Sequence, residues 1–153
     1  NDFIYYYEKG FRSNKIGIPA GVFSGAALPK NAEGYYSRIY SKELVLEAYK
    51  GIETFFTGKL NGTTIMQGLS LSDYTDHMEG NLEEKLSATI LAQFERAKTK
   101  INELDSNLVS QVESDNSEML LTFDELQKAV ILLKVDMLRA ISINADYVDA
   151  DGD

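Results

Sequence analysis

Residues 82–104 read LEEKLSATILAQFERAKTKINEL, and this stretch decides the fold. Apolar side chains recur in it at every third or fourth position, which is typical of an amphipathic helix. The stripe consists of Leu82, Leu86, Ile90, Phe94, Ala97, Ile101 and Leu104, and Leu108 continues it. The helix should be roughly 35 Å long at 1.5 Å per residue. Asn81 and Glu84 match a capping box, which predicts that the helix begins at this point.

The same pattern continues toward the C-terminus after a predicted break at 105–107. A second stripe consists of Leu120, Phe123, Leu126, Val130, Leu133, Met137 and Ile141. It predicts a helix from about Ser117 to Ser142, with a second capping-box pattern at 122–125. Residues 143–148 alternate as a strand does, but they are too few to form a sheet alone. Glycine and proline are absent from 81–151, so long helices are favoured there.

The N-terminal half differs in composition, because it holds ten of the eleven glycines and both prolines. A helix is predicted from Ser41 to Thr57, with Gly58 as its stop. Residues 71–78 should form one or two further turns, closed by Gly80. Residues 2–11 are interpreted as the end of a helix, and 13–34 as a long ordered loop.

These elements predict an all-α protein, an antiparallel helical bundle with a long ordered Gly/Pro loop near the N-terminus. We expect one domain over residues 1–153. A fourth helix would come from residues 2–12 together with whatever precedes Asn1. The apolar start Phe3-Ile4-Tyr5-Tyr6-Tyr7 lacks an initiator methionine and any signal-peptide pattern. We therefore expect the chain to begin inside a larger fold.

Composition excludes several classes of function. The 153-residue chain carries a net charge of −9, which argues against a nucleic-acid partner. It has no cysteine, so thiol nucleophiles, disulfides and cysteine-based metal sites are excluded. It has a single histidine, so no site can use several histidine ligands. No apolar run reaches the roughly 20 residues that a transmembrane helix needs.

Two places could hold a metal ion. Asp149, Asp151 and Asp153 supply hard oxygen donors around one glycine, although their spacing differs from that of an EF-hand. The alternative is an exposed acidic tail. His77 lies four residues after Asp73, so the two could converge on a helix, and the alternative is a surface or capping histidine.

The glycine-rich loop is the other candidate. It lacks the Gly-Lys-Ser/Thr of a phosphate-binding loop and the glycine that a nucleophile elbow needs before its serine. Twelve of the sixteen aromatic residues lie in 1–60, which is compatible with an interface or with a mixed core and rim. We predict an interface with a missing half of the protein, formed by Gly17, Pro19, Gly21, Gly25, Tyr35 and Tyr36.

Three segments together resemble the C-terminal half of the imelysin family. They are Lys15-Ile16-Gly17-Ile18-Pro19-Ala20-Gly21 with Leu28-Pro29, then Phe55-Phe56-Thr57-Gly58 with Gly68-Leu69 and Asp73-Tyr74, and finally Asp151-Gly152-Asp153. The resemblance implies an exported protein of the periplasm or outer membrane of Gram-negative bacteria, often a lipoprotein. It also implies two related helical bundles, of which this chain would be the second, with the N-terminal half as its partner.

The resemblance implies a part in iron uptake, with iron or another divalent metal as a possible cofactor and iron or an iron-carrying ligand as a possible partner. The family is classed as peptidases, and its Gly-x-His-x-x-Glu signature lies in the N-terminal bundle. That signature is absent here, because His77 is preceded at the second position by Thr75 and followed at the third by Gly80. No catalytic residue is therefore assigned. Three functions stay open: a binding or accessory module for iron uptake, half of a metallopeptidase, and a non-enzymatic helical interaction domain.

Overall fold

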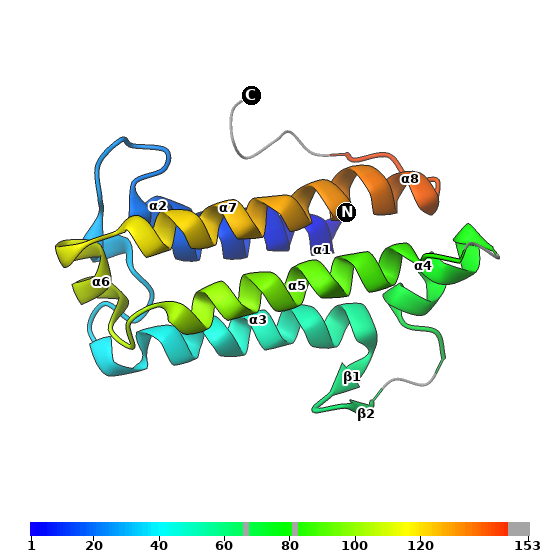
Figure 1. The fold of residues 1–153 in the computed structure, drawn as a ribbon, viewed down its shortest axis with the longest axis horizontal. Coiled ribbons are helices and arrows are strands. Elements are labelled where there is room, and N and C mark those ends of the chain that lie inside the picture. Colours follow the sequence, from blue (N-terminus) through cyan, green and yellow to red (C-terminus); the bar gives the residue numbers. More distant parts are fainter. Residues whose placement is uncertain (66–67, 81–82, 147–153) are drawn as a thin grey trace.

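A computed structural model describes residues 1–65, 68–80 and 83–146. In these ranges, four long helical rods form an antiparallel bundle, which confirms the predicted all-α class (Figure 1). The N-terminal rod joins α1 (Asp2–Tyr5), η1 (Tyr6–Gly17) and α2 (Ile18–Ala20). The middle rods are α3 (Ser41–Thr57) and α5 (Leu86–Glu103). The C-terminal rod joins α7 (Ser117–Ile131), η4 (Leu132–Met137) and α8 (Leu138–Ala140).

Short elements close the two ends of the bundle. One end carries α6 (Leu108–Ser114) and a loop with the 3₁₀ turns η2 (Pro29–Asn31) and η3 (Arg38–Tyr40). The other end carries α4 (Leu71–Glu79) and a hairpin of β1 (Lys59–Leu60) and β2 (Thr63–Thr64). The strands are antiparallel, with Lys59 opposite Thr64. Asn61 and Gly62 join them with φ values of 51° and 78°, as a tight hairpin turn requires.

The core lies between the rods and is aromatic at its centre. α3 contributes Val45, Tyr49, Ile52 and Phe56 to it, and α5 contributes Ile90, Phe94, Ala97 and Ile101. Both sets follow the spacing of one helix face. The Phe94 ring lies 5.7 Å from that of Tyr7 and 5.6 Å from that of Phe56, between centroids. This packing joins the N-terminal rod, α3 and α5.

The N-terminal rod is longer than the sequence predicts, because the helix does not end at Phe11. It continues to Ala20, and the Gly/Pro loop begins only at Gly21, whose φ is 82°. Gly17 does not end the helix. A Cβ at this position would lie 2.6 Å from Cε2 of Phe123. The glycine lets the N-terminal and C-terminal rods approach closely. The N-terminal rod thus supplies the fourth helix of the bundle.

Two other predicted features are wrong. α5 begins at Leu86, with Lys85 as its N-cap, so Glu83 and Glu84 precede the helix rather than open it. Thr122 does not cap a helix, because its hydroxyl donates to the Glu118 carbonyl 2.7 Å away within α7. Residues 143–146 form no strand. The predicted break at 105–107 is confirmed, since Asn107 caps α6 there.

Candidate functional site

Two ionic side chains are buried between the N-terminal and C-terminal rods. Glu8 and Arg12 are each about 1% exposed, and Arg12 Nη2 lies 3.8 Å from Glu8 Oε1. Lys134 Nζ lies 3.5 Å from the other carboxylate oxygen, Oε2. Arg12 also donates to Oε1 of Gln127, and its guanidinium carbon lies 4.6 Å from the centroid of the Phe123 ring. We call these five residues the ionic cluster.

The ionic cluster coincides with a rare backbone geometry. Both η1 and η4 are π-helical, and π-helices usually occur as single turns, often at functional sites. Glu8 lies in η1 and Lys134 in η4, so the ion pair joins the two segments. The Ser13 hydroxyl donates to the Glu8 carbonyl at 2.9 Å and adds a further bond across the wide turn. Both Glu8 oxygens face cations, so the cluster anchors one rod to the other.

A second polar network joins α5 to α7. Gln93 donates from Nε2 to the backbone carbonyl and to Oε1 of Glu125, at 2.9 Å each. Lys128 lies 2.5 Å from the other Glu125 oxygen, and this contact is the main reason that the pKa of Glu125 is lowered. The network, like the ionic cluster, holds neighbouring helices in position.

Two tyrosine hydroxyls are also buried in the core. Tyr7 donates to the carbonyl of Leu126 at 3.3 Å, and Tyr49 donates to that of Phe94 at 3.0 Å. Burial raises the pKa of both phenols above 10.0, because the charged form loses its hydration. They therefore stay neutral in the folded protein and hold rods together.

The outside of α3 carries a second apolar stripe, formed by Leu44, Ala48, Gly51 and Phe55. Its spacing of four, three and four residues keeps it on one face of the helix, about a quarter turn from the buried stripe. Leu44 is 43% exposed and Phe55 is 58% exposed, and Gly51 is exposed as well, whereas Ala48 is half-buried and packs against the core. We call it, with Phe3 and Tyr6 of the N-terminal rod beside it, the α3 face.

The α3 face contains an open notch of about 450 Å³ near the C-terminal end of α3. Asp2, Phe3, Tyr6, Gly51, Ile52 and Phe55 line it. The rings of Phe3 and Phe55 stack with centroids 4.8 Å apart and form one wall. Gly51 leaves the floor open, since nothing lies within 4 Å of where its Cβ would be. The notch could accept a large apolar or aromatic side chain.

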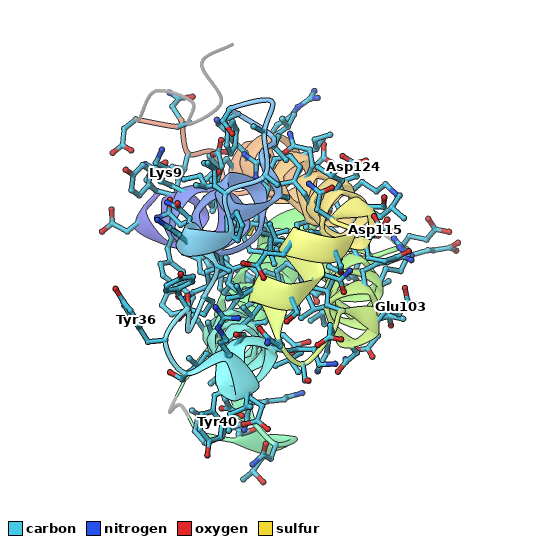
Figure 2. All side chains as sticks on the ribbon, turned by 90° about the vertical axis from the view of Figure 1, so that its left-hand side faces the viewer. Lys9, Tyr36, Tyr40, Glu103, Asp115 and Asp124 are labelled. Atoms are coloured by element: carbon cyan, nitrogen blue, oxygen red, sulfur yellow. The ribbon has the colours of Figure 1, made fainter. Side chains whose placement is uncertain are left out.

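A tyrosine-rich loop lies at the other end of the same helix. Tyr36 is 97% exposed and Tyr40 is 53% exposed, and Figure 2 shows both projecting away from the bundle. The loop is held against the α3 face, because a Cβ on Gly34 would lie 3.2 Å from Leu44 Cδ1. Large exposed aromatic side chains of this kind are enriched where proteins bind one another.

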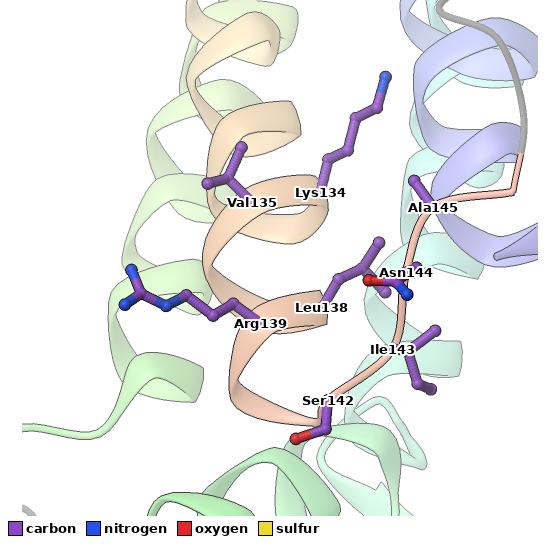
Figure 3. A pocket seen from close by; sticks show the side chains of 8 residues that line it. All are labelled: Lys134, Val135, Leu138, Arg139, Ser142, Ile143, Asn144 and Ala145. Atoms are coloured by element: carbon purple, nitrogen blue, oxygen red, sulfur yellow. The ribbon is translucent and has the colours of Figure 1, made fainter.

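An open depression beside the C-terminal rod is less suited to binding. It measures about 580 Å³ and is lined by Lys134, Val135, Leu138, Arg139 and residues 142–145. Its two cations do not converge, because Figure 3 shows Arg139 pointing away from residues 142–145, while Lys134 pairs with Glu8. The depression therefore does not form a two-cation site for an anion.

The candidate metal ligands do not come together in the described residues. Asp149, Asp151 and Asp153 lie outside those residues. His77 is exposed on α4, and Asp73 accepts a hydrogen bond from the Ser70 backbone at 3.0 Å in a capping box. Within 1–65, 68–80 and 83–146, no group of three or more His, Asp or Glu side chains could hold a metal ion.

The predicted interface residues separate into two groups. Gly17, Pro19 and Gly21 are buried within the chain's own packing, whereas Gly25 and Tyr36 are exposed and Tyr35 is half-buried. The sequence pattern did not predict the α3 face or the ionic cluster. A signal for the first was available, because the apolar residues of α3 cover a wider arc than one buried stripe needs.

Comparison with protein-family models, curated proteins and solved structures finds no match for this chain. In the described part of the chain, no helix is long and apolar enough to cross a membrane.

Proposed function

We propose that this chain is a binding or accessory module, the C-terminal helical half of an imelysin-like exported protein that takes part in bacterial iron uptake. The observation that carries the proposal is the α3 face, an exposed apolar surface that includes an open notch. Apolar surfaces of this kind mark sites where other molecules bind. The family and the cellular role rest on the sequence resemblance, which places the protein in the periplasm or outer membrane.

Iron enters the proposal as cargo of the whole protein. Among residues 1–65, 68–80 and 83–146, no set of donor side chains fits an iron ion. An iron-carrying ligand or a metal held mainly by the N-terminal half is consistent with this lack. The module would then contribute recognition and shape.

The test uses the full-length protein and a strain that lacks its gene. Calorimetric titration with ferrous iron, ferric iron and haem should detect binding of at least one of them. The deletion strain should grow poorly when iron is limiting, and the intact gene should restore growth. If the protein binds none of the three and growth is unchanged, the proposal fails.

The same material distinguishes the metallopeptidase alternative. Cleavage of a broad peptide library that stops with a chelator, and with replacement of an upstream histidine, would favour half of a metallopeptidase. Normal growth under iron limitation together with tight binding of another protein would favour a simple interaction domain.

A further inference from the structure

We propose that the α3 face binds the α3 face of a second copy of this chain, with the two α3 helices antiparallel about a two-fold axis. This inference assigns an occupant to the same α3 face on which the proposed function rests, and its test does not involve iron. The first argument is shape. The notch lies near Gly51 and Phe55, and the projecting tyrosines Tyr36 and Tyr40 lie at the opposite end of α3.

An antiparallel pair brings each projection to the other copy's notch. Leu44 and Phe55 are separated by about 16 Å along the helix at 1.5 Å per residue. Turning a second copy end over end therefore places its tyrosine loop beside the first copy's Phe55. A surface that carries both a projection and a matching recess is self-complementary, as an isologous interface must be.

The residue sizes along the stripe fit the same arrangement. In the antiparallel register, Leu44 of each copy lies opposite Phe55 of the other, and Ala48 lies opposite Gly51. Large residues meet at the two ends and small residues meet at the middle. Small residues at a crossing point let two helix backbones approach closely. Adding a side chain at Gly51 should therefore separate the helices.

The charges beside the stripe are also complementary. Glu47 and Lys50 lie on the outer flank of α3, where Lys50 Nζ is 3.6 Å from Glu47 Oε2 within one chain. The antiparallel register places Glu47 of each copy beside Lys50 of the other, so the pair can be made twice across the axis. The overall charge of −9 opposes association, so moderate salt should strengthen the dimer by screening that repulsion.

The first experiment measures the mass of the 153-residue chain by sedimentation velocity over a range of concentrations. Gly51→Glu is the test variant, because open space at Gly51 lets the folded monomer accept the side chain. Ala92→Glu is its control, since it adds the same charge at an exposed position of α5. We expect a dimer for the native chain and the control, and a dissociation constant at least about tenfold higher for Gly51→Glu. Circular dichroism checks that both variants are folded.

The second experiment tests the register by disulfide cross-linking. The chain has no cysteine, so introduced thiols have no competitor. Mixing the Leu44→Cys and Phe55→Cys variants should give the mixed dimer under mild oxidation, whereas Leu44→Cys alone should not cross-link. A native chain that stays monomeric at about 1 mM, equal dimerisation of Gly51→Glu, or cross-linking of Leu44→Cys alone would overturn the proposal. The iron-binding test is separate, so either result can fail without the other.

Discussion

Replacing Arg12 by methionine should destabilise the bundle strongly. Glu8 is 1% exposed and faces two cations, so the change removes one of them while the carboxylate stays buried. Breaking a buried ion pair from one side typically lowers the free energy of unfolding by about 3–5 kcal/mol. A chain of this size has about 5–15 kcal/mol in total. At about 2–4 °C per kcal/mol, the melting temperature should fall by roughly 10 °C.

The double variant Glu8→Leu with Arg12→Met should recover much of this loss. Apolar residues of similar size often replace a buried ion pair at little cost, and Lys134, 17% exposed, can turn its amine toward water. We expect an interaction free energy of about 2 kcal/mol in the double-mutant cycle. Urea unfolding followed by circular dichroism gives all the values needed.

A matched control is the pair of Lys98 and Glu53, 2.9 Å apart and partly exposed. Lys98→Met should cost no more than about 1 kcal/mol, because solvent screens such pairs. Arg12→Met should lower the free energy of unfolding by clearly more than Lys98→Met does. Equal losses for the two variants, or effects of Glu8→Leu and Arg12→Met that simply add, would refute a strong contribution from the buried ion pair.

Three further outcomes are expected. The contribution of Tyr7 and Tyr49 to stability should be constant below about pH 10 and fall above it, because the unfolded chain then releases phenol protons that burial retains on these two residues. Tyr49→Phe should flatten that fall in alkaline melts, and an unchanged slope would contradict the assignment. Ser70→Ala should cost about 1 kcal/mol by removing the cap of α4. It should also raise the pKa of Asp73, which the Ser70 hydroxyl holds below 3.8, and an NMR titration measures this change. The stability that the cap contributes is therefore present above pH 3.8 and is lost as the pH falls through the pKa of Asp73 in the folded protein. Gly51→Ala should raise the free energy of unfolding of the dilute monomer by about 0.5–1 kcal/mol in urea melts, and a decrease would show that the position is not open within one chain.

The sequence predicts the fold class because periodicity records burial directly. The stripe from Leu86 to Ile101 and the helix from Ser41 to Thr57 lie where the pattern places them. Helix ends are harder to predict, since a glycine can either end a helix or allow a neighbouring helix to approach closely. Gly17 allows a close approach, and the ring that packs against it belongs to Phe123, far along the chain.

The site is less predictable for the same reason. Glu8 and Arg12 are four residues apart, a spacing that is common for exposed pairs on a helix. Only the packing of the C-terminal rod buries them and brings Lys134 to the same carboxylate. On α3, Leu44 and Phe55 look like members of one buried face until the structure separates them into an outer stripe.

The ionic cluster also bears on the order in which the chain folds. α3, α5 and the C-terminal rod can each pack against a neighbouring helix along the chain, whereas the N-terminal rod packs on α3 and, more extensively, on the C-terminal rod far along the chain. The contact of Glu8 with Lys134 closes a separation of 126 residues, and that of Tyr7 with Leu126 one of 119. Closing such long loops costs entropy before the contacts compensate for it. The N-terminal rod should therefore dock last, so that Arg12→Met accelerates unfolding while leaving the folding rate almost unchanged.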